Sequence, residues 1–240
     1  MPKLQYDIPM EQLINRQIRL WERTFEKGKR ARDESVNPCI TISKEIGSQG
    51  VELAKRLAER LNWNLFDKSL VEYIAEDAKV RQSMVEIFDE KTQNEIHSWV
   101  LTLLDHHALG SDRYFKHLMT VIRTIGEHGC AVIVGRGSNF ILPPTKALRL
   151  KVVAPEENRV AYIMQKQELD RKEADKLVKR ADAERSAFIR RFYHQDAENP
   201  LCYDLVLNLG TLSLPIAEEM VIQALKARFP QFKINSLLEK

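Results

Sequence analysis

Residues 39–61 read CITISKEIGSQGVELAKRLAERL, and this stretch decides the fold class. Its first four residues are apolar or β-branched, which predicts a short buried strand. Two glycines follow, and beyond them apolar residues recur at helical spacing, at Leu53, Ala54, Leu57, Ala58 and Leu61. The sequence therefore predicts a strand, a glycine-bearing turn and a helix with one buried face, in that order.

Four further short runs have the composition of strands, and helical patterns separate them. The runs cover residues 64–67, 130–134, 148–153 and 205–207. Strands that alternate with helices predict a parallel sheet covered on both faces, because parallel strands need long, right-handed crossovers. We therefore expect an α/β protein with five parallel strands flanked by helices.

The composition is that of an ordinary folded protein. The 240 residues carry a formal net charge of +3 and are 44% hydrophobic, which excludes disorder as the main state. No run of about 18 apolar residues is free of charge, and the first residues lack the layout of a signal peptide. We expect a cytoplasmic protein without a membrane span. The 3 cysteines are far apart and predict neither a disulfide framework nor a zinc site.

The composition shifts near Pro38, which we take as a domain boundary. Before it, one helical stripe carries Ile14, Ile18, Trp21 and Phe25, and the polar run KGKRARDESVNP follows. We predict an N-terminal amphipathic helix and linker (1–37), a main domain (38–230) and a C-terminal tail (231–240). Acidic residues dilute the basic face of this helix, which favours packing on the main domain or a homo-oligomer over a membrane surface.

Chemistry is expected just after the strands, because ligands of such sheets bind beyond the strands' carboxyl ends. After the first strand, glycines would let successive backbone N–H groups turn toward an anion at the start of the helix. The residues of this turn that could bind a phosphate are Ser43, Gly47, Ser48, Gln49 and Gly50. A plain connection between strand and helix is the alternative.

This turn is not a Walker A motif. Val51 and Glu52 stand where that motif has a lysine and a hydroxyl residue. Lys44 is the nearest cation that could replace the missing charge.

Two other strand ends carry charged residues. Arg136 lies between two glycines, where it could present its guanidinium group to a phosphate, or pair with a neighbouring carboxylate. Asp67 could hold a sugar or base donor group, or cap the helix that begins near Ser69.

Residues 170–193 form a highly charged stretch with helical spacing. A solvated helix face is the ordinary interpretation. Arginines near a phosphate site are also what a lid over a triphosphate needs, because positioned positive charge catalyses phosphoryl transfer. Arg185 and Arg190 are the first candidates, and Arg180 and Asp182 are the next.

In this order, the motifs resemble the cytidylate kinase-like family, a branch of the P-loop nucleoside monophosphate kinases. The resemblance spans residues 38–229 and rests on ITISKEIGSQGVELAKRLAERLNWNLFDKSLVEYIA, VIVGRGSNFIL, LRLKVVAPEENRVAYIM, ADAERSAFIRRFY and YDLVLN. It implies a three-layer P-loop kinase-like fold with a helical acceptor-side insertion and a helical lid. It also implies transfer of the γ-phosphoryl group of ATP, with Mg²⁺, to a nucleoside monophosphate or similar small acceptor.

The resemblance also implies roles for individual residues. Catalytic roles fall on Lys44, Arg136 and Arg185, nucleotide binding on residues of 43–50 and Arg190, and acceptor binding on Asp67, Arg136 and Asp182. The Mg²⁺ ligands are left unassigned.

The chain departs from the family pattern at three positions. Cytidylate kinases carry lysine where Gly50 stands, family members usually carry a basic residue where Val51 stands, and true cytidylate kinases have aspartate where Gly137 stands. The alternative function is therefore a catalytically impaired nucleotide-binding regulator or scaffold, and cytidine specificity is not expected. A nucleic-acid partner is not expected either, because acidic residues alternate with the basic ones.

Overall fold

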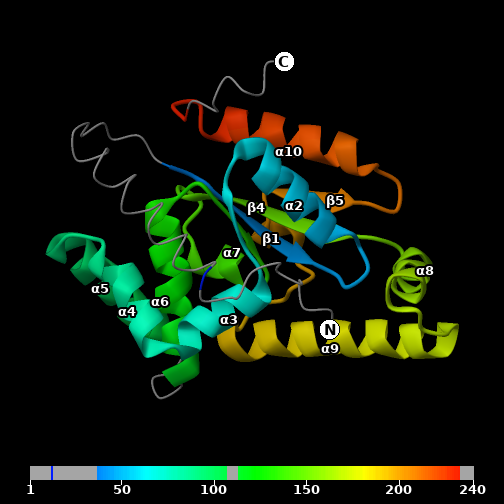
Figure 1. Ribbon diagram of the computed structural model, residues 1–240, viewed down its shortest axis with the longest axis horizontal. Helices are drawn as coiled ribbons and strands as arrows, with labels where there is room; N and C mark the ends of the chain where they lie inside the picture. The colour runs from blue at the N-terminus through cyan, green and yellow to red at the C-terminus, as the bar shows by residue number, and fades with distance from the viewer. Residues whose placement is uncertain (1–11, 13–36, 107–112, 233–240) are drawn as a thin grey trace.

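The computed structural model describes Gln12 and residues 37–106 and 113–232. Its centre is a sheet of parallel strands in the order β2-β3-β1-β4-β5 (Figure 1). The strands are β1 (Cys39–Lys44), β2 (Asn64–Phe66), β3 (Ala131–Val134), β4 (Ala147–Val153) and β5 (Leu205–Asn208). The predicted α/β class and the five-stranded parallel sheet are confirmed, and each strand forms where an apolar run was found.

Strand β1 occupies the middle of the sheet. Cys39 at its start pairs with Ala131 of β3 on one side and Ala147 of β4 on the other. Because all strands are parallel, the carboxyl end of β1 at Lys44 opens onto the centre of the edge where ligands bind in such sheets. The fold thus places the glycine-bearing turn at that edge.

One face of the sheet is covered by α2 (Gly50–Leu61) and α10 (Leu214–Arg228). Figure 1 shows the two helices side by side above the strands. Ile40 and Ile42 of β1 point into this layer and are fully buried. An ion pair also connects the two helices, because Arg56 of α2 donates to the buried Glu218 of α10 at 2.6 Å.

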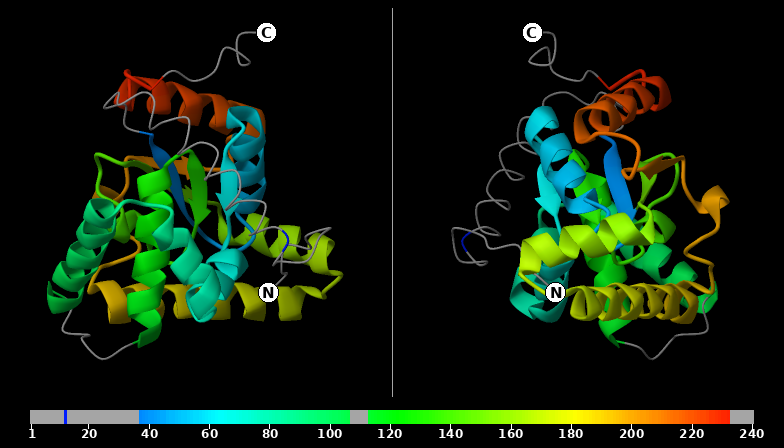
Figure 2. Two further views of the ribbon diagram at one scale, coloured as in Figure 1. Left: turned by 60° about the vertical axis from the view of Figure 1, so that its left-hand side comes forward. Right: turned by 90° about the vertical axis from the view of Figure 1, so that its right-hand side faces the viewer.

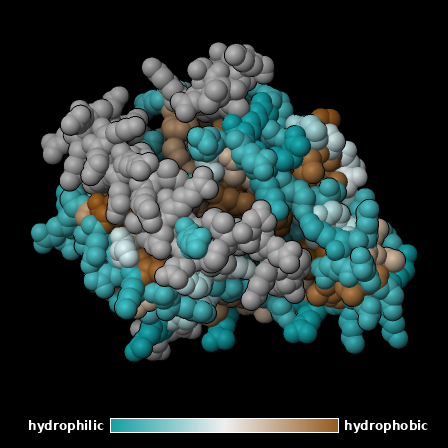
Figure 3. All heavy atoms as spheres, viewed as in Figure 1, coloured by the Kyte–Doolittle hydropathy of each residue, from teal (hydrophilic) through white to brown (hydrophobic). Residues whose placement is uncertain are grey.

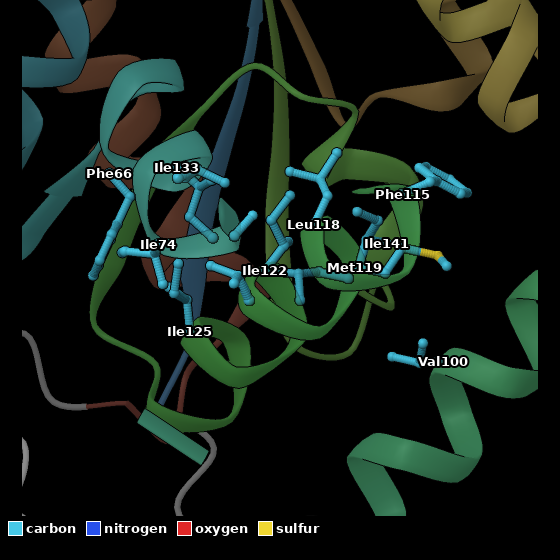
Figure 4. Close-up of a cluster of buried hydrophobic side chains, with 14 of the residues drawn as sticks. Phe66, Ile74, Val100, Phe115, Leu118, Met119, Ile122, Ile125, Ile133 and Ile141 are labelled. Carbon is cyan, nitrogen blue, oxygen red and sulfur yellow. The ribbon is translucent and has the colours of Figure 1, made fainter. Parts of the chain in front are cut away.

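The opposite face is covered by α3 (Lys68–Glu76), α6 (Arg113–His128) and the short α7 (Ser138–Ile141). Helix α6 supplies much of this core, and Figure 4 shows its apolar side chains directed toward Phe66, Ile74 and Ile133. Alternation along the strands explains the two layers, because successive side chains of a strand point to opposite faces.

The remaining helices extend the three layers. Helices α4 (Ala78–Glu86) and α5 (Glu90–His106) lie between β2 and β3 in the chain, whereas α8 (Glu156–Gln167) and α9 (Arg171–Tyr193) lie between β4 and β5. A short 3₁₀ turn, η1 (Pro200–Cys202), precedes β5. Asp170 starts α9 with a complete capping box, in which it pairs reciprocally with Glu173.

Helix α9 joins two separate apolar clusters. Its first half packs Ala174 and Val178 against α8, whereas its last turn buries Phe192 and Tyr193 in the core beneath the sheet. Residues 182–188 between these ends are exposed or half-buried. Figures 1 and 2 show the helix as one continuous rod from the α8 side of the molecule toward α6.

Several sequence predictions concern the surface and the termini. Most of the described surface is hydrophilic in the view of Figure 3. None of the helices in the described part of the chain is long and apolar enough to cross a membrane.

The cysteines are free, and burial raises the pKa of the Cys39 thiol to about 12. The amphipathic stripe at 14–25 lies outside the described residues.

Candidate functional site

The turn after β1 has the geometry of an anion cradle. Gly47 and Gln49 both adopt left-handed backbone conformations, with φ of 78° and 61°. Helix α2 starts directly afterwards, and its N-cap residue Gln49 makes no side-chain cap. The Gln49 side chain therefore accepts no hydrogen bond from the N–H groups in the first turn of α2. The positive end of the helix dipole faces the turn. Ser48 is buried and donates its hydroxyl to the Glu45 carbonyl oxygen at 2.8 Å.

Gly47 is also a point of close contact with α8. A Cβ atom at this position would lie 2.6 Å from the backbone carbonyl oxygen of Arg159. The Arg159 side chain is buried and donates to Asp182 of α9 at 2.8 Å, and it pairs with Glu45 at 3.3 Å. The loop, α8 and α9 are thus held together by one arginine that the sequence analysis did not single out.

Lys44 lies beneath the start of α2. A Cβ at Gly50 would lie 2.8 Å from the Cβ of Lys44, so the lysine stem packs against the helix backbone at that point. Burial lowers the pKa of Lys44, and the nearby Glu52 opposes this shift, whereas Arg185, Lys166 and Lys68 add to it. Lys44, the cation predicted to replace the missing lysine, therefore lies next to the glycine-bearing turn and near three other positive charges.

Glu52 occupies the position of the Walker hydroxyl residue and is engaged by α8. Tyr162 donates its hydroxyl to Glu52 Oε1 at 2.6 Å, and Lys166 donates to the same oxygen. Burial alone would raise the pKa of Glu52, but these two hydrogen bonds lower it. The carboxylate is therefore ionised and already neutralised by a lysine.

Arg185 connects the middle of α9 to the end of β1. Its Nη1 donates to the Lys44 carbonyl oxygen at 3.3 Å and to Asp182 at 3.1 Å, and its Nη2 donates to Glu198 at 2.9 Å. Glu198 also pairs with the buried Lys151 of β4. Arg185 and Asp182 thus lie beside the end of β1, where the glycine-bearing turn begins.

Arg190 does not join this cluster. It is exposed in the last turn of α9, where its carbonyl oxygen accepts the capping N–H of His194. Its predicted nucleotide contact stays a prediction, and the structure places it five residues beyond Arg185, on another side of the helix. Ser43 is half-buried, and its hydroxyl lies 3.4 Å from that of Tyr203.

Arg136 lies just after β3, between Gly135 and Gly137. Its guanidinium group pairs with Glu72 of α3 and lies 5.1 Å from the centroid of the Phe188 ring. Its Nε is buried without a hydrogen-bond partner among the described residues, and burial lowers the pKa of Arg136 to about 10. The nearby charge of Arg136 lowers the pKa of Lys68, after the larger effect of desolvation. Two cations, Lys68 and Arg136, therefore lie near each other at this edge of the sheet.

Asp67 is the N-cap of α3. Its Oδ1 accepts the backbone N–H of Leu70 at 2.8 Å, and the residue is buried. The capping alternative raised from the sequence is therefore present in the structure. An additional contact with an acceptor stays a prediction.

Two substitutions separate these roles of Asp67. Asp67→Ala removes the cap and is expected to cost about 1 kcal/mol of folding stability, or roughly 2–4 °C in Tm for a chain of this size. Asp67→Asn keeps a capping oxygen, so we expect the wild-type Tm with a raised KM for the acceptor. Thermal melting and acceptor titrations provide both readouts. Unchanged acceptor KM in Asp67→Asn would restrict the residue to capping.

The site also contains residues that sequence reasoning missed. They are Lys68, Glu72, Lys151, Arg159 and Glu198. Each contributes through a partner from a distant part of the chain, so no local motif could have revealed it. Among the described residues, no group of three or more His, Cys, Asp or Glu side chains forms a metal site.

A parallel sheet whose central strand leads into a glycine-bearing turn and a helix, with Arg185 of α9 bonded to the end of that strand, defines an α/β protein of the nucleoside monophosphate kinase-like fold. The model of the cytidylate kinase-like family matches residues 39–211, and the chain belongs to that family. No curated protein matches the chain significantly.

Several solved structures are similar to this chain, and one of them shares its fold at a TM-score above 0.5. The crystal structure of an uncharacterized protein from Eubacterium ventriosum ATCC 27560 is 21% identical, with a TM-score of 0.59 over 79% of this chain and 99% of that chain. A shikimate kinase from Bacteroides thetaiotaomicron is 13% identical over 79% of this chain and 96% of its own, with a TM-score of 0.41. Another from Acinetobacter baumannii, in complex with shikimate, is 11% identical over 86% and 97%, with a TM-score of 0.45.

Proposed function

We propose that the protein transfers the γ-phosphoryl group of ATP to a nucleoside monophosphate or a similar small anionic acceptor. The observation that carries the proposal is the convergence of positive charge at the carboxyl edge of the sheet. Lys44 comes from β1, Arg136 follows β3 and Arg185 comes from α9. Phosphoryl transfer depends on positioned positive charge around the phosphates, so three independent elements that converge here suit this chemistry.

The two sides of the site have different proposed tasks. The turn at 45–50 would hold the nucleotide phosphates through backbone N–H groups, with Lys44 beneath it and Arg185 over it. Arg136 would hold the anionic group of the acceptor, because its guanidinium is fixed between Glu72 and the Phe188 ring. Asp182 and Glu198 accept hydrogen bonds from Arg185 and orient it. When a phosphate binds, some of the N–H groups of Arg185 would donate to the phosphate instead.

The residues present fit a nucleotide phosphate, with Mg²⁺ bound mainly through that phosphate. The side-chain-uncapped first turn of α2 is suited to a phosphate. Mg²⁺ commonly binds through one or two carboxylates together with substrate phosphates and waters, so it needs no dedicated protein cluster. Bound Mg²⁺ would neutralise charge on the transferring phosphate. Glu52 is the carboxylate of the turn region that would hold it, directly or through water.

A second candidate function is nucleotide binding without turnover. Gly50 and Val51 supply no charge at the two positions where related kinases carry lysine or another basic residue, and the adjacent Glu52 is engaged by Tyr162 and Lys166. A regulator or scaffold would retain the cradle and the lid contacts but would not transfer phosphate.

One experiment separates the two functions. We expect ATP at a hundredfold excess over its Kd to stabilise the full chain by about 2.7 kcal/mol, which raises Tm by roughly 5–10 °C. The same samples, with Mg²⁺ and a panel of ribo- and deoxynucleoside monophosphates, are assayed for ADP release. Acceptor-dependent ADP supports the kinase, and stabilisation without ADP supports the binding protein. No shift with ATP, ADP or any monophosphate would contradict both.

A further inference from the structure

Lys166 reaches from the last turn of α8 to the first turn of α2. Its Nζ donates to Glu52 Oε1, and it lies 2.7 Å from the hydroxyl of Tyr162, which donates to the same carboxylate oxygen. Glu52 directly follows Val51 in the chain. The lysine ammonium group is therefore held at the first turn of α2, on the residue that follows Val51 in the chain.

The placement of α8 against the loop is fixed by the backbone. The contact between Gly47 and the Arg159 carbonyl leaves no room for a Cβ atom, so helix and loop touch directly. Arg159, Tyr162 and Lys166 are spaced three and four residues apart and therefore lie along one face of α8. The same face that packs on the loop thus delivers the lysine.

The local charges require such a cation. Glu52 is ionised in the first turn of α2, where it would repel an incoming phosphate unless it is neutralised. Lys166 pairs with it, and although burial alone would lower the pKa of Lys166, its hydrogen bonds with Glu52 and Tyr162 raise it. The Lys166 side chain remains 45% exposed, so it is accessible from solvent.

We propose that Lys166 binds the phosphates of the nucleotide and supplies from α8 the positive charge that Val51 does not supply. Glu52 and Tyr162 position its ammonium group. The inference rests on the proposed nucleotide site and adds a binding residue to it. Helix α8 would then contact the nucleotide through Lys166, in addition to the proposed contact of α9 through Arg185.

The test measures the Kd of ATP and ADP for the full chain and its variants by calorimetry. Lys166→Ala is expected to weaken ATP binding on the order of tenfold or more, the size of a lost hydrogen bond to a charged group. Lys166→Arg should recover most of the affinity. Lys172→Ala, which removes an exposed lysine in the first turn of α9, should bind as the wild type does. Equal ATP affinity in Lys166→Ala and the wild type would overturn the inference.

Further variants distinguish contact with the phosphates from neutralisation of Glu52. We expect Lys166→Ala to weaken ATP binding several-fold even in a Glu52→Gln background. Loss of the effect in that background would show that the lysine merely neutralises Glu52, and it would overturn direct binding. Tyr162→Phe should weaken binding less than Lys166→Ala, because one positioning hydrogen bond is lost and the charge remains.

Failure of the proposed nucleotide site is distinguishable from failure of this inference. A wild-type chain that binds no nucleotide contradicts the site itself. A wild-type chain that binds ATP, together with a Lys166→Ala variant of equal affinity, contradicts the role of Lys166 and leaves the site intact.

Discussion

Replacing Arg136 by alanine is expected to lower phosphoryl transfer about 100-fold or more. Removing one positioned hydrogen-bond donor that stabilises charge in the transition state typically lowers the rate by two to three orders of magnitude. Arg136 is held between Glu72 and the Phe188 ring, so its guanidinium is oriented before an acceptor arrives. Steady-state ADP release, measured with ATP and acceptor varied separately, gives the change in kcat and in each KM.

The kinetics also decide whether Arg136 is a binding residue or only the ion-pair partner of Glu72. A binding residue affects the acceptor parameters while ATP affinity stays near the wild-type value. Arg171→Ala is a matched control, because it removes an arginine that is 70% exposed and pairs with the equally exposed Glu157. A folded Arg136→Ala protein with unchanged turnover would remove Arg136 from the mechanism.

The second large effect concerns stability, at Gly137. This residue has a φ of 66°, and a Cβ atom here would lie 2.2 Å from the Tyr193 ring. Tyr193 is fully buried and donates its hydroxyl to the Arg136 carbonyl oxygen at 2.6 Å, so the ring has little freedom to move. Gly137→Ala therefore combines left-handed backbone strain of about 1–2 kcal/mol with overpacking of about 1–3 kcal/mol.

The expected result is a fall in Tm of roughly 5–15 °C for Gly137→Ala, measured by thermal melting. Gly135→Ala is the matched control two residues away. It has a similar positive φ of 82°, but nothing lies within 4 Å of its added Cβ, so it should show the backbone strain alone. Equal losses in the two variants would mean that the Tyr193 contact adds no cost, contrary to the structure.

The sheet was predictable because its signal is local. Each strand is a short apolar run, and each is bounded by glycine, proline or charged residues within a few positions. The strand ends were less certain. The apolar run at 39–42 continues as a strand to Lys44, because pairing with β4 extends two residues beyond pairing with β3.

The candidate site was only partly predictable. Lys44, Arg136 and Arg185 could be selected because they follow strands or recur on a charged helix, and the structure brings Lys44 and Arg185 into contact. The partners that orient these residues could not be selected. Glu72 and Glu198 look like ordinary surface carboxylates in the sequence, and only folding places them beside Arg136 and Arg185.

The sequence by itself determined the α/β class, the parallel sheet and the glycine turn at the carboxyl end of β1, because hydrophobic spacing and turn residues act over a few neighbouring positions. Only the tertiary structure decided which charges meet at that turn. Lys166 lies 114 residues from Glu52 in the chain, and Arg185 lies 141 residues from Lys44. Such pairs form because the packing of α8 and α9 on the sheet edge positions them, and packing over those separations leaves no periodic trace in the sequence.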